Sequence, residues 1–158
     1  MIMKNKHKKK NKNIWIWTLA ILVIGVFVYF VYSDKPSSNS VENPYESEII
    51  SRNGIHWHPE LSIYIKGEKV EIPANIGLGA VHNPIHTHDE DSQLGVIHLE
   101  FSSVVRGRDT KLSEFFKIWN KDINSFGSNI RMTVNGSDNL DFGNYYMKDG
   151  DKIVLNFD

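Results

Sequence analysis

Residues 61–72 have the sequence L-S-I-Y-I-K-G-E-K-V-E-I, which has the pattern of a β-hairpin. Apolar and polar side chains alternate strictly over residues 61–65 and again over residues 70–72, and the turn sequence K-G-E separates the two runs. Strict alternation is typical of a strand that buries one face, because successive side chains of a strand point to opposite sides. We therefore predict two antiparallel strands joined by a tight turn.

Four segments that follow the hairpin also have the patterns of regular elements. Residues 96–101 (V-I-H-L-E-F) alternate and predict a strand. Residues 112–119 place apolar side chains at i, i+3, i+4 and i+7, which is the spacing of an amphipathic helix. Residues 130–134 and 153–157 predict two further strands, the first of them followed by the turn sequence N-G.

The order of these elements indicates the fold class. Without the inserted strand at residues 96–101, the order is β-β-α-β-β, which is similar to the β-grasp arrangement of a sheet curled around one helix. We therefore predict an α+β domain with a small β-grasp-like sheet and one main helix. The alternative is an all-β sandwich of the cupin-like type with one short helix.

The first 47 residues differ in composition from the rest of the chain. Residues 1–13 carry six lysines and no acidic residue, whereas the nineteen residues 14–32 carry no charge. A helix of that length extends about 28 Å, which is close to the ~30 Å hydrocarbon core of a bilayer. Tryptophans at the start of this segment and tyrosines at its end are typical of the two membrane interfaces. We therefore predict an N-terminal transmembrane helix at residues 14–32.

The charge beside the predicted span indicates its orientation. Lysine-rich flanks stay on the cytoplasmic side, so residues 1–13 are predicted to be a cytoplasmic basic tail. The polar, Pro- and Ser-containing residues 33–47 are predicted to be a linker, and residues 48–158 a His-rich extracytoplasmic domain anchored at the cell membrane. A cleaved signal peptide is the alternative, but V-Y-S-D-K-P-S-S is a poor match to a small-residue cleavage site.

The composition excludes several classes of protein and site. The chain has no cysteine, which rules out disulfides, thiolate metal sites and a cysteine nucleophile. The six N-terminal lysines leave 12 basic against 19 acidic residues in the remainder, a net charge of −7. We expect no nucleic-acid partner, because such affinity comes largely from basic groups that neutralise phosphates. The same negative charge suits the attraction of cations.

Six of the seven histidines lie between residues 56 and 98, and five of these occur in three short motifs. The motifs are H-W-H-P at 56–59, P-I-H-T-H-D at 84–89 and I-H-L-E at 97–100. Each motif places two candidate ligands at i and i+2, on the same face of an extended strand. Imidazole and carboxylate ligands without sulfur suit copper(II) or zinc, so we predict a site for one such divalent ion. The ligand candidates are His56, His58, His86, His88, Asp89, His98 and Glu100.

The parity of the first and last motifs predicts that their ligands share a face. In the strand V-I-H-L-E-F the apolar side chains face the core, so His98 and Glu100 face the other way. His56 and His58 face the same way if the strand of residues 61–65 extends back to them through the proline. Two neighbouring strands would then present ligands on one side, with the H-T-H-D loop folded over them.

These patterns support a metal-binding protein that sequesters, delivers or senses the ion. An enzyme is the alternative, because three histidines and a carboxylate around an open coordination position would suit a cupin-like oxygenase or a hydrolase. A third hypothesis is a structural domain that the metal clamps. We assign no catalytic residue, and the spacing leaves open whether His82 or Asp91 joins the site.

Five motifs resemble those of a family of largely uncharacterised bacterial and archaeal proteins, which are membrane-anchored or secreted. In chain order they are H-W-H-P-E-L-S-I-Y-I-K-G, I-P-A-N-I-G, P-I-H-T-H-D, G-V-I-H-L-E and L-S-E-F-F-K-I-W, within residues 56–119. The resemblance implies that the seven ligand candidates are the polar signature of that family, and it implies no particular reaction. The link E-D-S-Q-L between Asp89 and Gly95 is longer than is usual in the family.

Overall fold

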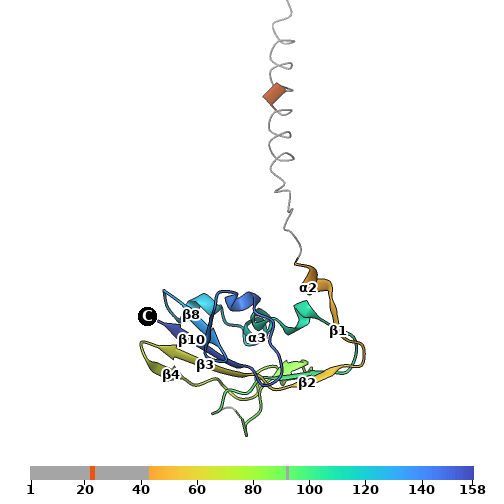
Figure 1. The fold of residues 1–158 in the computed structure, drawn as a ribbon, viewed down its shortest axis with the longest axis horizontal. Coiled ribbons are helices and arrows are strands. Elements are labelled where there is room, and N and C mark those ends of the chain that lie inside the picture. Colours follow the sequence, from red (N-terminus) through yellow and green to blue (C-terminus); the bar gives the residue numbers. More distant parts are fainter. Residues whose placement is uncertain (1–21, 24–42, 92) are drawn as a thin grey trace, which may run out of the picture. The chain divides into compact units, whose positions relative to one another are not determined.

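The computed structural model describes residues 22–23, 43–91 and 93–158. A compact unit spans Glu42–Asp158, and its described residues form three sheets and a few short helices (Figure 1). This mixed structure, mostly sheet with few helices, agrees with the predicted α+β class.

The largest sheet has five strands in the order β4-β3-β10-β8-β9. β3 and β10 pair in parallel at its centre, and every other pair in this sheet is antiparallel. Figure 1 shows β3 and β10 side by side, with β4 and β8 flanking them. The strands are β3 (Glu60–Ile65), β4 (Glu68–Val70), β8 (Arg131–Val134), β9 (Ser137–Asn139) and β10 (Lys152–Phe157).

Two tight turns close the hairpins of this sheet, and both lie where the sequence predicts them. Lys66 and Gly67 join β3 to β4 with φ angles of 51° and 85°. Asn135 and Gly136 join β8 to β9 with φ angles of 51° and 82°. Two successive positive φ angles are the signature of the type I′ turn, whose twist matches that of the strands it connects. The predicted hairpin and the predicted N-G turn are therefore confirmed.

The predicted amphipathic helix is also confirmed as α3 (Leu112–Ile118). Its buried side chains Leu112, Phe115 and Phe116 belong to one apolar cluster with the inward-facing residues of the large sheet. Full burial of such a side chain contributes about 1.5–3 kcal/mol, so the apolar stripe holds the helix on the sheet. The short 3₁₀ helices are η1 (Gly107–Thr110), η2 (Ile123–Phe126) and η3 (Phe142–Asn144).

Two smaller sheets complete the unit. A three-stranded sheet has the order β2-β6-β5, and a two-stranded sheet pairs β1 with β7. All their pairs are antiparallel. These strands are β1 (Ile49–Ser51), β2 (Ile55–Trp57), β5 (Ile85–His86), β6 (His98–Phe101) and β7 (Val105–Arg106).

The chain passes from the three-stranded to the five-stranded sheet at Pro59. β2 pairs with β6, whereas β3 pairs with β10 and β4, so the continuous strand considered from the sequence is wrong. Proline has no N–H to donate to a ladder, and it breaks the strand here. The Pro59 carbonyl still accepts a hydrogen bond from the Ile97 N–H at 2.8 Å, which ties the two sheets together.

The folded unit begins earlier than the predicted boundary at residue 48. Residues Pro44–Ser47, assigned to the linker, form helix α2, and the Asn43 side chain caps it by accepting from the Tyr45 N–H. The Lys111 ammonium donates to the Glu46 carboxylate, which fastens α2 to the start of α3. A short proline-initiated helix was not visible in the sequence, because its support comes from these distant contacts.

Most of the predicted N-terminal organisation lies outside the described residues. Of the predicted span at 14–32 the structure describes only Leu22 and Val23, which are helical. The tail at 1–13 and residues 33–42 of the linker are not among the described residues. Within the part of the chain that is described, no helix is long and apolar enough to cross a membrane.

Candidate metal centre

The three-stranded sheet brings four candidate ligands to one face. His86 on β5 is the register partner of His98 on β6, and Glu100 on β6 is the partner of His56 on β2. His98 and Glu100 are two positions apart on the central strand, so their side chains point to the same side. Cross-strand partners also share a face, so His86 and His56 join them there.

The opposite face of this sheet is buried, and it fixes the register. Leu99 is the partner of Trp57 on one side and of Ile85 on the other. Leu99 and Ile85 are 0% and 3% exposed, and Trp57 packs against the same cluster. A slip of one residue would turn the histidines toward the apolar cluster, so burial of these apolar side chains holds His86 and His98 on the opposite face of the sheet.

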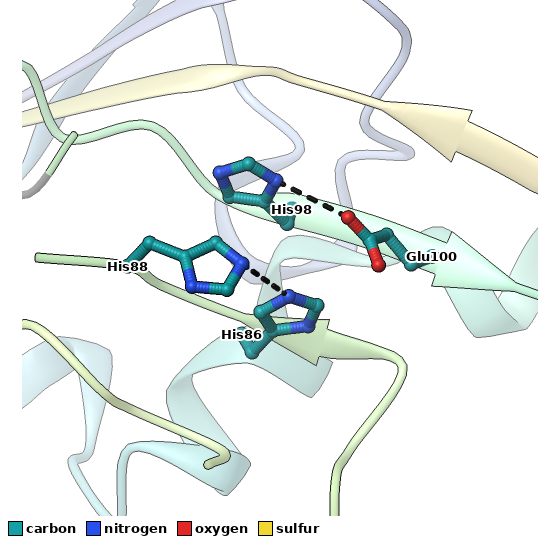
Figure 2. A group of neighbouring side chains, drawn as sticks. All are labelled: His86, His88, His98 and Glu100. Atoms are coloured by element: carbon teal, nitrogen blue, oxygen red, sulfur yellow. Dashed lines mark hydrogen bonds and ion pairs between the residues drawn. The ribbon is translucent and has the colours of Figure 1, made fainter. Parts of the chain in front are cut away.

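A first group of ligand atoms converges at this face, as Figure 2 shows. The group consists of His86, His88, His98 and Glu100, and its ligand atoms all lie within 4.8 Å of one another. The Nε2 atoms of His86 and His88 are 3.1 Å apart, and His98 Nδ1 is 3.5 Å from Glu100 Oε1. Ligands that bind zinc tetrahedrally at 2.0–2.1 Å are separated by roughly 3.3 Å, which is close to both distances.

Hydrogen bonds fix which nitrogen of two histidines is available. His86 Nδ1 lies 3.0 Å from the Asn83 carbonyl and can only donate to it, which leaves the Nε2 lone pair directed at His88. His98 Nε2 lies 3.2 Å from Asp91 Oδ2, and donation to this carboxylate leaves the lone pair on Nδ1. A carbonyl or carboxylate on the outer nitrogen is typical of metal-bound histidine.

The inner nitrogen of His98 is buried and has no hydrogen-bond partner among the described residues. Its 3.5 Å approach to Glu100 is an ion-pair distance without hydrogen-bond geometry. A buried polar atom left unsatisfied costs about 1–3 kcal/mol, so native proteins rarely retain one. A metal ion among the four ligand atoms would give the buried nitrogen of His98 the partner that it lacks. The donor set therefore fits a metal ion.

Burial and neighbouring charge set the protonation of the group. Burial lowers the pKa of His86, although the Asn83 carbonyl and the Glu100 charge act in the opposite direction. Burial raises the pKa of Glu100, but His56, His86 and His98 together outweigh it and leave this pKa below its ordinary value. Neutral imidazole and ionised carboxylate are the forms that bind a metal, so both shifts favour ligation near neutral pH.

The H-T-H segment is held in place by its central residue. Thr87 is fully buried, and its hydroxyl donates to the Pro73 carbonyl at 2.9 Å and accepts from the Ile76 N–H at 3.1 Å. With the threonine directed inward on an extended backbone, His86 and His88 point together to the other side. The sequence predicted this pairing from the i, i+2 spacing.

A second group of ligand atoms lies beside the first and shares one residue with it. His56, His58 and His98 also have ligand atoms within 4.8 Å of one another. The side chains of His56 and His58 are 64% and 43% exposed. His56 Nε2 lies 3.0 Å from Glu100 Oε1, and the backbone N–H of His58 donates to the Asp149 carboxylate at 2.8 Å. The two groups together contain six of the seven predicted ligands.

The seventh, Asp89, belongs to neither group. Its carboxylate accepts from the Asn75 amide at 2.9 Å. His82 is also in neither group, but its Nε2 lies 3.4 Å from that of His86. Asp91, whose role the spacing left open, contacts the outer nitrogen of His98. Its position in the acidic run after H-T-H is the only sequence signal for that role.

Comparison of the chain with protein families, with curated proteins and with solved structures finds no match. The resemblance drawn from the motifs therefore stays a prediction.

Proposed function

We propose that this protein binds one divalent transition-metal ion through His86, His88, His98 and Glu100. The observation that carries the proposal is the convergence of these four ligand atoms within 4.8 Å, with the outer nitrogens of His86 and His98 already hydrogen-bonded. Three imidazoles and a carboxylate supply four nitrogen and oxygen ligands for such an ion. We refer to this group as the inner site.

Copper(II) and zinc are the two candidate ions. The inner site has nitrogen and oxygen donors, and the chain has no cysteine, which argues against a Cu(I) thiolate carrier. Affinity order alone favours copper, whereas the separations of 3.1 Å within the His86–His88 pair and 3.5 Å within the His98–Glu100 pair are also compatible with zinc. We propose sequestration, delivery or sensing of this ion as the role of the protein.

We place this activity outside the cell membrane. The uncharged residues 14–32 would anchor the domain, and the lysines before them would keep the N-terminus in the cytoplasm. The proposal predicts that protease added to intact cells degrades the domain but spares an epitope placed at residue 1. An epitope lost together with the domain would contradict this orientation.

We further propose that the five-stranded sheet and α3 form a β-grasp-like unit. The support is the parallel pairing of β3 with β10 at the sheet centre, with β4 beside β3 and the β8–β9 hairpin beside β10, and with α3 between the two hairpins in the chain. In that view the three-stranded sheet that carries the ligands is an addition to the unit.

One observation favours a metal-dependent enzyme as a second candidate. A hollow of about 480 Å³ adjoins the ligands, and His56 and Glu100 form part of its lining. This hollow is shallow and open to solvent, and it leaves room for a small substrate beside the ion. An oxygenase or hydrolase would need an open coordination position with exchangeable water, whereas a structural clamp would have none.

The test is elemental analysis of the full chain, purified in detergent without a histidine tag. We expect about one equivalent of copper or zinc per chain. The variant H86A/H88A should lose tight binding because two of the four ligands are gone, and H82A should keep it. Circular dichroism of both variants checks that they fold. A wild-type chain that holds no metal and takes up neither ion would refute the proposed function.

A further inference from the structure

We propose that His56, His58 and the shared His98 form a second, solvent-facing metal site, through which an ion reaches the inner site. We call this group the outer site. The inference rests on the proposed function, because it describes how the same centre is loaded. Its starting point is that the inner and outer groups have a ligand in common.

The shared ligand can serve one ion at a time. His98 Nε2 is directed at Asp91 Oδ2 at 3.2 Å, so Nδ1 is its available donor. That nitrogen is buried, has no hydrogen-bond partner among the described residues, and carries a single lone pair. Full occupancy of one site therefore takes His98 away from the other. The two sites are successive positions of one ion and not places for two ions.

Among the histidines of the two sites, exposure is highest at His56 and His58 and lowest at His86, while His88 is partly buried. The side chains of His56, His58 and His98 are 64%, 43% and 10% exposed, and His86 is fully buried. A hydrated ion can therefore meet His56 and His58 directly, whereas His86 is closed to solvent.

The imidazole rings form a continuous series between these ends. Ring centroids are 4.7 Å apart from His56 to His58, 4.8 Å from His58 to His98, and 4.6 Å from His98 to His88. The last step, from His88 to His86, is 4.7 Å. At such spacing an ion can gain its next ligand before it loses the previous one.

The carboxylate of Glu100 contacts both sites. Its Oε1 lies 3.0 Å from His56 Nε2 and 3.5 Å from His98 Nδ1. An anionic ligand at this position can stay on the ion while its histidine ligands change, which keeps the charge compensated during the transfer. The hollow lined by His56 and Glu100 gives the water shell of an incoming ion room to leave.

A plain surface ion pair between His56 and Glu100 is the competing explanation. Such a pair contributes about 0–1 kcal/mol, and it leaves the buried nitrogen of His98 unsatisfied. It also gives no reason for His58 to contribute to the same group. Metal loading accounts for the contact of His56 with Glu100, for the unsatisfied nitrogen of His98 and for the position of His58.

Cobalt(II) is a suitable probe, because its visible absorption distinguishes tetrahedral from hydrated octahedral coordination. The full chain in detergent is mixed with Co²⁺ in a stopped-flow instrument, and bound metal is measured afterwards at equilibrium. We expect H56A/H58A to bind the same amount as wild type but to load on the order of tenfold more slowly. Both side chains are exposed, so this variant should fold. H82A should load like wild type, because His82 belongs to neither group.

The complementary variant isolates the outer site. H86A/H88A should bind Co²⁺ weakly, with the spectrum of a partly hydrated ion, and the further change H98A should abolish that binding. An unchanged loading rate in H56A/H58A would overturn the inference, as would the absence of weak binding in a folded H86A/H88A. If wild type bound two ions at the same time, the two sites could not share His98, and the inference would be overturned. Wild type that binds no metal would instead refute the proposed function.

Discussion

Asp91 holds the outer nitrogen of His98, with 3.2 Å between Oδ2 and Nε2. The other nitrogen of the ring faces Glu100, although Asp91 itself is in neither ligand group. A carboxylate behind a histidine fixes the tautomer and increases the basicity of the ligand. The orientation of His98 in the proposed inner site therefore depends on a residue outside both ligand groups.

Replacement of Asp91 should weaken metal binding without abolishing it. We expect D91A to lower the affinity about 10–100-fold, and D91N less, because the amide oxygen can still accept from His98. Competition with a chromophoric chelator measures the affinity. D89N is the matched control, since Asp89 contacts Asn75 and lies outside both groups. Wild-type affinity in D91A would show that the contact is incidental.

Metal should stabilise the fold through the inner site. An ion present at 100 times its Kd adds about 2.7 kcal/mol to the free energy of unfolding, which corresponds to roughly 10 °C in Tm for a domain of this size. Thermal unfolding with and without zinc, after chelator treatment, measures this shift. H86A/H88A should show little of it, and an equal shift in that variant would mean that zinc binds elsewhere.

The metal-free protein should lose stability as the solution is acidified. The pKa of His86 is lowered by burial from its ordinary value of 6.5, so below pH 6.5 the unfolded chain binds a proton that the folded protein resists. Stability contributed by neutral His86 is thus complete above pH 6.5 and falls as the pH drops toward and through the lowered pKa. Urea unfolding across this range measures the slope. H86Q, which has no titrating group, should have a shallower slope.

Gly95 should tolerate no side chain. Its φ is 74°, and an added Cβ would lie 2.1 Å from the Leu61 carbonyl oxygen, at the junction of the two larger sheets. We expect G95A to lower the free energy of unfolding by more than about 2 kcal/mol. G67A is the matched control, because Gly67 has a similar φ of 85° but open space around it, and its cost should be about 1 kcal/mol. Equal losses in urea unfolding would contradict the steric explanation.

Local patterns in the sequence predicted the elements and part of the site. Alternation in V-I-H-L-E-F placed His98 and Glu100 on one face, and the i, i+2 spacing paired His86 with His88. These predictions succeed because the two-residue period of a strand is a local property. The N-G and K-G turns were predictable for the same reason, since their conformation depends on the two residues themselves.

Contacts between distant segments could not be predicted from the sequence. The pairing of His56 with Glu100 depends on the register of β2 against β6, which the buried partners of Leu99 fix. Asp91 reaches His98 only because its own carbonyl accepts from the N–H groups of Leu94 and Gly95 and so turns the chain back. No period in the sequence encodes either arrangement.

Because the register sets His86 opposite His98, an ion bound by both would cross-link β5 to β6. The two residues are 12 positions apart in the chain. For a disulfide across a loop of similar length, the chain-entropy treatment gives about 3 kcal/mol of stabilisation, through restriction of the unfolded ensemble. A chain without cysteine would thereby obtain a cross-link that forms without an oxidant and opens whenever the ion leaves.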